Sequence, residues 1–230
     1  MESQVQVVRD SETGTERAGL TDRQNAVLES ALNLLVEGGE KAVTTAGVAR
    51  AANCSKESLY KWFGDRDGLL SAMIAYQAGK VRTVDASGDA LTSEGLRKNL
   101  SAFAHDLLDV LSGEVSLALN RLAIGQTVGK GRAASRGGPT LGRLLEERGR
   151  RQIGRRAATL LEAGRRAGFL AFDDADEAYG TLYGLIVTDT HLRMLLGEDP
   201  QALKQEFAAR AERAVTSFLA LYGVNATADA

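Results

Sequence analysis

The sequence predicts an all-α protein of about nine helices, and three observations lead to this fold class. The chain has only two prolines and few aromatic residues, whereas Ala, Leu, Arg and Glu, which favour helices, are abundant. Apolar residues recur at spacings of three and four, as they do on one face of a helix. No run alternates apolar and polar residues as a half-buried strand would.

The first helix is expected to begin at Thr21, after a polar arm. Residues 1–20 have no apolar periodicity and are expected to be disordered. Thr21 and Gln24 form the pattern of a capping box, in which both side chains bond to the backbone at the start of a helix. Apolar residues then follow at helical spacing until Gly38 and Gly39, which end the helix.

Residues 44–63 predict two short helices joined by a tight turn. Thr44 and Thr45 can cap the first helix, and Ser55 can cap the second. Asn53 stands where the chain must reverse, and Asn tolerates the left-handed conformation better than most residues. This arrangement is a helix–turn–helix, which places its second helix in the major groove of DNA.

The second of these helices has one buried face and one outer face. Leu59 and Phe63 lie four residues apart and are expected to be buried together. Two lysines, a hydroxyl and two large aromatic rings are left for the outer face, namely Lys56, Ser58, Tyr60, Lys61 and Trp62. Such side chains can contact phosphates, guanine edges and thymine methyl groups. The alternative is an exposed helix with incidental aromatic residues.

The rest of the chain predicts a larger helical domain. Helices are expected at about 65–84, 96–111, 115–126, 140–167, 173–196 and 199–222. Polar loops are expected at 85–93 and, in a Gly- and Arg-rich stretch, at 129–139. Gly168 ends the very basic helix, and Asp199 followed by Pro200 is a typical helix start.

Composition excludes several classes of protein. The formal net charge of −2 means that any affinity for nucleic acid must come from a local positive surface. A single Cys excludes an internal disulfide and suits a reducing compartment. No apolar run approaches the ~20 residues that span a bilayer, and the N-terminus lacks the apolar core of a signal peptide. We therefore expect a cytoplasmic protein without a membrane partner.

Neither a metal site nor a catalytic site is expected. His105 and His191 have no Cys or carboxylate partners at ligand spacing, and His105 falls on the polar side of its helix. The segment 125–132, GQTVGKGR, lacks the spacing and the Ser or Thr of a phosphate-binding loop. Cys54 is either a redox-sensitive thiol or, as we favour, a small residue packed under the turn. No cofactor is expected, and no nucleophile stands with a base and an acid, so the protein is not expected to be an enzyme.

The N-terminal part resembles the TetR family of bacterial transcriptional regulators. The resemblance runs from Thr21 to about Met73, and its most specific part is a Leu-Tyr-x-x-Phe pattern beginning four residues after a Ser, at Ser55. The residues that carry it are Gly38, Gly39, Thr44, Thr45, Val48, Ala49, Ala52, Ser55, Leu59, Tyr60, Phe63, Leu69 and Leu70. Three conservative departures occur, because Asn53 replaces the usual Gly, Cys54 replaces a small aliphatic residue and Arg66 replaces Lys.

The resemblance implies a homodimeric, ligand-responsive repressor with a DNA-binding domain at 21–66 and an effector-binding and dimerisation domain at 67–230. The operator would be palindromic double-stranded DNA. The resemblance places Thr45 and Arg66 on the phosphate backbone, beside the outer face of the reading helix. The small-molecule effector would be mainly apolar, and aromatic or anionic. Its expected cavity is formed by Phe103, Leu107, Leu122, Tyr179, Tyr183, Ile186 and Asp189.

Two segments of the C-terminal part leave alternatives open. The arginines between 143 and 166 either form a solvated face or include one or two that point inward to an anionic or phenolic effector. The helix around 179–194 is apolar on more than one side and can serve the dimer, the effector or both.

Three rival functions also remain open. They are an activator or unresponsive regulator of the same fold, a DNA-architectural protein, and a small-molecule binder or enzyme with a vestigial DNA-binding part.

Overall fold

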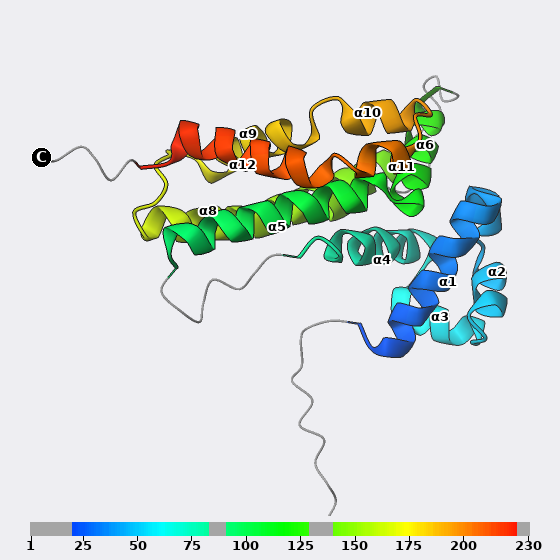
Figure 1. Cartoon of the computed structure of the whole chain (residues 1–230). Helices are drawn as coiled ribbons and strands as arrows, with labels where there is room; N and C mark the ends of the chain where they lie inside the picture. Colours follow the sequence, from blue (N-terminus) through cyan, green and yellow to red (C-terminus); the bar gives the residue numbers. More distant parts are fainter. Residues whose placement is uncertain (1–19, 83–90, 129–139, 225–230) are drawn as a thin grey trace, which may run out of the picture.

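The computed structural model describes residues 20–82, 91–128 and 140–224, and these residues form an all-helical structure (Figure 1). Nine of its α-helices have seven or more residues, which confirms the predicted fold class. The elements are α1 (Asp22–Gly38), η1 (Glu40–Ala42), α2 (Thr45–Ala51), α3 (Lys56–Phe63), α4 (Arg66–Gly79), α5 (Ser93–Ser112), α6 (Glu114–Val128), α7 (Leu141–Leu144), η2 (Leu145–Arg150), α8 (Arg151–Arg166), α9 (Ala175–Val187), α10 (Thr190–Leu195), α11 (Pro200–Lys204) and α12 (Phe207–Tyr222).

Three of the expected segments fall largely outside this range. The N-terminal arm lies outside it except for Leu20, the Gly- and Arg-rich loop at 129–139 lies outside it entirely, and the loop at 85–93 does so up to residue 90. Among the described residues, no helix combines the length and the apolar character that crossing a membrane requires.

Helices α1, α2 and α3 form a small head whose local structure follows the sequence closely. The capping box of Thr21 and Gln24 is present, and Thr44 and Ser55 each accept a hydrogen bond from the backbone three residues later. Asn53 has φ 49°, so the turn between α2 and α3 does use the left-handed conformation. Arg23 of α1 donates to the carbonyl oxygens of Ala52 and Asn53 at 2.9 and 2.6 Å, which ties this turn to the first helix.

The core of the head extends into the body of the protein. Buried residues of α1 and α3 form one apolar cluster with Leu69, Met73 and Ile74 of α4. Leu119 of α6 and Leu144 of α7 belong to the same cluster, although they lie far along the chain. The head is therefore held against the body by packing as well as by the covalent connection through α4.

The body has a second apolar core between four long helices. Helix α12 packs on α5 and α9, and α9 packs on α8 (Figure 1). Phe103, Phe207 and Phe218 are completely or almost completely buried among them. Figure 1 shows the head at one end of this body, with α4 running from the head along the body.

The fourth helix is shorter than the sequence suggested. It was expected to reach about residue 84, but α4 ends at Gly79, and Lys80 and Val81 turn back to the carbonyls of Gln77 and Ala78. The reason is tertiary, because Arg156 of α8 donates to the carbonyl oxygens of Ala78 and Val81 at 2.6 and 3.3 Å. These carbonyls are then satisfied without a further helical turn.

Three expected long helices are interrupted. A π-helical turn, η2, separates α7 from α8 within the basic helix. The helix expected at 173–196 breaks at Thr188, which has φ 45°, and resumes as α10. The last helix breaks between α11 and α12. A β-branched residue at positive φ is costly, and only the surrounding contacts can hold it there.

An ion pair fixes the chain just beyond α4. Arg82 donates to Asp106 of α5 from its backbone N–H and from two guanidinium nitrogens, at 3.1, 2.8 and 2.9 Å. These hydrogen bonds lower the pKa of the Asp106 carboxyl, while its partial burial acts in the opposite direction. Because both Arg82 and Arg156 act on this short segment, the C-terminal end of α4 is fastened to the body.

The ion pair predicts a pH-dependent contribution to stability. A carboxyl whose pKa is lowered in the folded state stabilises the protein above its unfolded pKa of about 3.9, and this contribution is lost as the pH falls through the folded pKa. Asp106→Asn should therefore lower the melting temperature by a few degrees at pH 7. The difference from the wild type should shrink below about pH 4, as measured by thermal denaturation. A difference that is constant from pH 7 to pH 3 would contradict the assigned role of the carboxylate.

Candidate functional site

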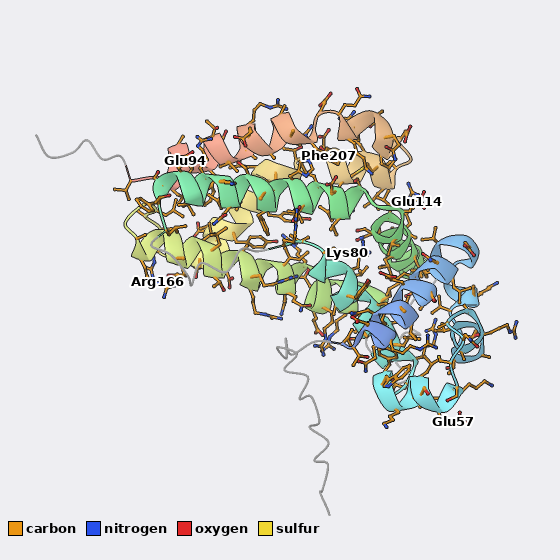
Figure 2. All side chains as sticks on the ribbon, turned by 60° about the horizontal axis from the view of Figure 1, so that its bottom comes forward. Glu57, Lys80, Glu94, Glu114, Arg166 and Phe207 are labelled. Carbon is orange, nitrogen blue, oxygen red and sulfur yellow. The ribbon has the colours of Figure 1, made fainter. Side chains whose placement is uncertain are left out.

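The outer face of α3 is a polar and aromatic surface at the tip of the head. Leu59 and Phe63 are buried as predicted, whereas Lys56, Lys61 and Tyr60 are exposed, with Tyr60 at 57%. Ser58 is half-buried and its hydroxyl lies 3.1 Å from that of Ser55. Figure 2 shows α3, marked by Glu57, at the side of the head that faces away from the body.

Three further predicted contact residues lie around this face. Trp62 is only half-exposed, because it packs against the core of the head with its ring 6.2 Å from that of Phe63 in an edge-on arrangement. Thr45 and Arg66 are the first residues of α2 and α4. The backbone N–H groups at helix starts favour anions, so both positions suit a phosphate.

The charge on the face is mixed. Glu57 is fully exposed in the first turn of α3, and its pKa is lowered by a hydrogen bond to its own backbone N–H, by Ser55 and by Lys56. The carboxylate therefore remains ionised beside the two lysines. A face of this kind combines attraction to phosphates with polar and aromatic groups that can distinguish base edges.

A second feature is a cavity of about 440 Å³ between the core of the head and the core of the body. Helix α4 contributes Ile74, Gln77 and Ala78 to its wall, and α5 contributes Leu107 and Leu111. Other wall residues come from α6, η2, α8, α9 and α10. The volume is in the range of small-molecule sites, and most of the lining is apolar.

The polar groups of the cavity include three buried atoms without a hydrogen-bond partner. They are Gln77 Oε1 on α4, Tyr179 OH on α9 and His191 Nε2 on α10. Burial raises the pKa of the Tyr179 and Tyr183 hydroxyls and lowers the pKa of His191. All three shifts favour the neutral form of the side chain at pH 7.

Two features of the sequence shape the cavity wall. A Cβ at Gly154 of α8 would come within 2.8 Å of Tyr179 Cε1, so the glycine allows the tyrosine ring to lie against the helix. The π turn η2 brings Glu146, Gly149 and Arg150 to the cavity, and π turns are frequent at functional sites. The Arg150 guanidinium lies 4.9 Å from the centre of the Tyr183 ring.

Two family profiles match this chain in the regions just described. Residues 27–73 match the family described as bacterial regulatory proteins, tetR family. Residues 98–224 match the AefR-like transcriptional repressor, C-terminal domain. The chain belongs to the TetR family. The first match covers the helix–turn–helix and the start of α4, and the second covers the helices of the body.

Solved structures of TetR regulators agree with this assignment. A TetR transcriptional regulator from Agrobacterium tumefaciens is 63% identical, with 90% of this chain and 97% of that chain covered and a TM-score of 0.73. The Flavonoid-responsive Regulator FrrA is 27% identical, with 89% and 98% covered and a TM-score of 0.60. A regulator from Mesorhizobium loti, 24% identical with 88% and 97% covered and a TM-score of 0.67, shares the fold. No protein with a curated description matches the chain.

The cavity brings together three of the seven residues that were expected to bind an effector. Leu107, Tyr179 and Tyr183 line it. The other four residues lie outside the cavity lining, because contacts with other parts of the protein fix their positions. Phe103 lies behind Tyr179 in the body core, Ile186 is fully buried there, Leu122 packs against the core of the head, and Asp189 is exposed before α10.

Sequence reasoning missed Gln77 and His191 as cavity residues. Gln77 was visible as a polar residue on the apolar face of the fourth helix, three residues after Ile74. His191 lies in the segment 179–194 that was expected to serve the dimer, the effector or both, and its direction depends on the break at Thr188. No group of three metal-ligating side chains gathers anywhere in residues 20–82, 91–128 and 140–224.

The basic segment, residues 143–166, contains both surface arginines and arginines that point inward, which were the two alternatives left open by the sequence. Arg143, Arg151 and Arg165 form ion pairs with glutamates on the surface. Arg150 reaches the cavity, and Arg156 caps α4. Cys54 is half-buried against the core of the head, and His105 is exposed, 3.1 Å from Asp109.

The unpartnered hydroxyl of Tyr179 predicts a stabilising substitution. A buried polar group without a partner costs roughly 1–3 kcal/mol, so Tyr179→Phe should raise the free energy of unfolding of the ligand-free protein by about 1 kcal/mol. The matched control is Tyr222→Phe, because the Tyr222 hydroxyl lies 3.1 Å from the Thr181 hydroxyl. This control should lower the same quantity by about 1 kcal/mol in urea denaturation. Equal destabilisation by both variants would mean that Tyr179 is already hydrogen-bonded.

Proposed function

We propose that this TetR-family protein is a transcriptional repressor that binds a palindromic operator as a homodimer and is released by a small, mainly apolar ligand. It acts by binding rather than by catalysis, on chromosomal DNA in the cytoplasm. The observation that carries the proposal is that α4 belongs both to the core of the head and to the wall of the cavity. A ligand in the cavity therefore touches the element on which the head is mounted.

Operator recognition is assigned to α3. Its exposed lysines and Tyr60 lie on the outer side of the head, with Thr45 and Arg66 at neighbouring helix starts. The net charge of −2 makes this local surface the source of DNA affinity. Two heads related by a two-fold axis would enter successive major grooves about 34–36 Å apart, which requires a palindrome.

The dimer surface is assigned to the outer faces of α9 and α12. Gly180 and Gly184 of α9 are exposed with open space around them, and they lie one turn apart on the same face. On α12, Ala209, Ser217 and Ala220 are exposed together with Arg213, and Leu221 is 66% exposed. Small residues on two adjacent helices allow a second pair of helices to approach closely, as in a four-helix bundle.

We assign the response to ligand to a movement of α4 about its C-terminal end, which is fastened to the body. Arg156 and the Arg82–Asp106 pair hold the C-terminal end of the helix, whereas the head is attached at the other end. A ligand that fits one position of α4 better than another shifts the separation of the two heads. FrrA, which is flavonoid-responsive, is a relative of comparable fold and supports a mainly apolar, aromatic ligand here.

The DNA contacts are tested by substitutions on the outer face of α3. The operator is first selected from random double-stranded DNA with the full-length protein. Tyr60→Ala and Lys61→Ala should each weaken operator binding by at least about tenfold, since every dimer loses two contacts. Lys61→Ala should also reduce the dependence of affinity on salt, because a phosphate contact is removed.

Lys98→Ala is the matched control for these substitutions, because Lys98 is an exposed lysine of α5 in the body. Its operator affinity should equal that of the wild type. Unchanged affinity of both α3 variants would contradict the assigned interface.

The dimer surface is tested at Gly184. A Cβ there meets no atom within 4 Å apart from its chain neighbours and the backbone of its own helix, so Gly184→Arg should fold normally but block close approach of a second subunit. Sedimentation at micromolar concentration should show a monomer, and operator affinity should fall by at least about tenfold because the two half-sites are no longer bound together. Gly125→Arg on α6, also in open space, should remain dimeric. A dimeric Gly184→Arg variant would place the interface elsewhere.

A further inference from the structure

The cavity holds an unusual concentration of buried polar atoms that lack partners. The described residues contain five such side-chain atoms, and three of them, Gln77 Oε1, Tyr179 OH and His191 Nε2, belong to residues of the cavity wall. Buried polar groups are almost always hydrogen-bonded, and each exception requires an explanation. The three residues come from three helices and line one mostly apolar space, so a bound molecule that reaches these side chains can supply the missing partners.

The three atoms differ in what they require. An amide oxygen such as Gln77 Oε1 can only accept, so its partner must carry an O–H or N–H donor. The Tyr179 hydroxyl and the Nε2 of a neutral histidine can each donate or accept. A single hydroxyl on the ligand can donate to Gln77 and accept from one of the other two. A ligand therefore needs at least one O–H or N–H donor to bond to Gln77 Oε1.

The surroundings favour an uncharged ligand. Tyr179, Tyr183 and His191 line the cavity, and burial shifts their pKa values toward the neutral forms. Among the described residues of the wall the one cation is Arg150, which lies over the Tyr183 ring, and Glu146, which also pairs with Arg151, lines the same cavity. The wall therefore presents one charge of each sign, and a carboxylate ligand would lose its hydration without a net positive charge to replace it.

The apolar part of the cavity suits a ring system. The rings of Tyr179 and Tyr183 have centroids 6.0 Å apart and both line the space. Leu107, Leu119 and Ile153 form further parts of the wall. Aromatic side chains bind aromatic ligands by edge and offset contacts that aliphatic chains do not provide.

We propose that the cavity binds an uncharged phenol whose hydroxyl donates to Gln77 Oε1 and accepts from Tyr179 or His191. The proposal rests on the proposed function, because it names the class of ligand for the same cavity. It also assigns Gln77 as the residue that distinguishes a ligand with a donor from a ligand of the same shape without one. Since Gln77 is part of α4, this hydrogen bond is made to the helix that carries the head.

The test uses three probes that share a biphenyl ring system and differ in the substituent at position 4: 4-hydroxybiphenyl, 4-methoxybiphenyl and biphenyl-4-carboxylate. Calorimetric titration of the full-length protein should show the phenol binding roughly tenfold tighter than the methyl ether, which lacks the donor. The carboxylate should bind more weakly than the phenol. Equal binding of phenol and ether, tightest binding of the carboxylate, or no binding of any probe would each overturn the proposal.

Substitutions test which side-chain atoms make the protein prefer the phenol over the methyl ether. Gln77→Met keeps a helix-favouring side chain of similar length but removes the acceptor, so the preference for phenol over ether should fall toward one. If Gln77→Met does not fold, Gln77→Leu serves in its place, because it also removes the acceptor and should bring the preference toward one. Tyr222→Phe, whose hydroxyl bonds to Thr181, should keep the wild-type preference. A variant at Gln77 that retains the full preference would overturn the role of Gln77.

A second readout separates this proposal from the proposed function. Operator binding is measured with saturating 4-hydroxybiphenyl and compared with binding in its absence. If the phenol binds more tightly than the ether and also releases the protein from the operator, both the ligand class and the ligand-responsive repressor are supported. If the phenol binds with that discrimination but operator affinity does not change, the ligand class stands and the ligand-responsive repressor is wrong.

Discussion

Capping of α4 by a guanidinium from α8 is the interaction on which the rest of the architecture depends. The last carbonyls of a helix have no partners within it, and here Arg156 satisfies the carbonyl of Ala78 in the helix and that of Val81 just beyond it. Arg82 then bonds to Asp106 of α5. Figure 2 shows Lys80, the residue between these contacts, lying between α5 and α8. The fastening sets the end of α4, hence the cavity wall that contains Gln77, and hence the position from which the head projects.

The head and the body are joined by more than this fastening. Leu119 of α6 and Leu144 of α7 are buried in the same cluster as Met73 of α4 and Leu28 of α1. Such packing resists small displacements and responds to larger ones by rearrangement. A helix that is fixed at one end and packed along its length into two cores is a suitable element for a two-state change, because both cores must repack together.

The polar chemistry of the cavity comes from local departures from regular structure. The π turn η2 brings Arg150 toward Tyr183, the glycine at 154 admits the ring of Tyr179, and the positive φ of Thr188 starts the short helix that carries His191. Each departure lowers the stability or interrupts the regular structure, and proteins commonly keep such features at functional sites. The three orphaned polar atoms follow the same pattern, since each is a buried polar group without a hydrogen-bond partner.

The sequence by itself determined the fold class, the helix–turn–helix and the family, because these follow from local rules. Caps at Thr21, Thr44 and Ser55 and the left-handed turn at Asn53 involve residues only a few positions apart. The cavity depended on the tertiary structure. Of the seven residues expected around an effector, three line it, because their direction depends on contacts from distant helices. The length of α4 was decided by Arg156, which lies 78 residues beyond Ala78, and no local pattern could report that contact.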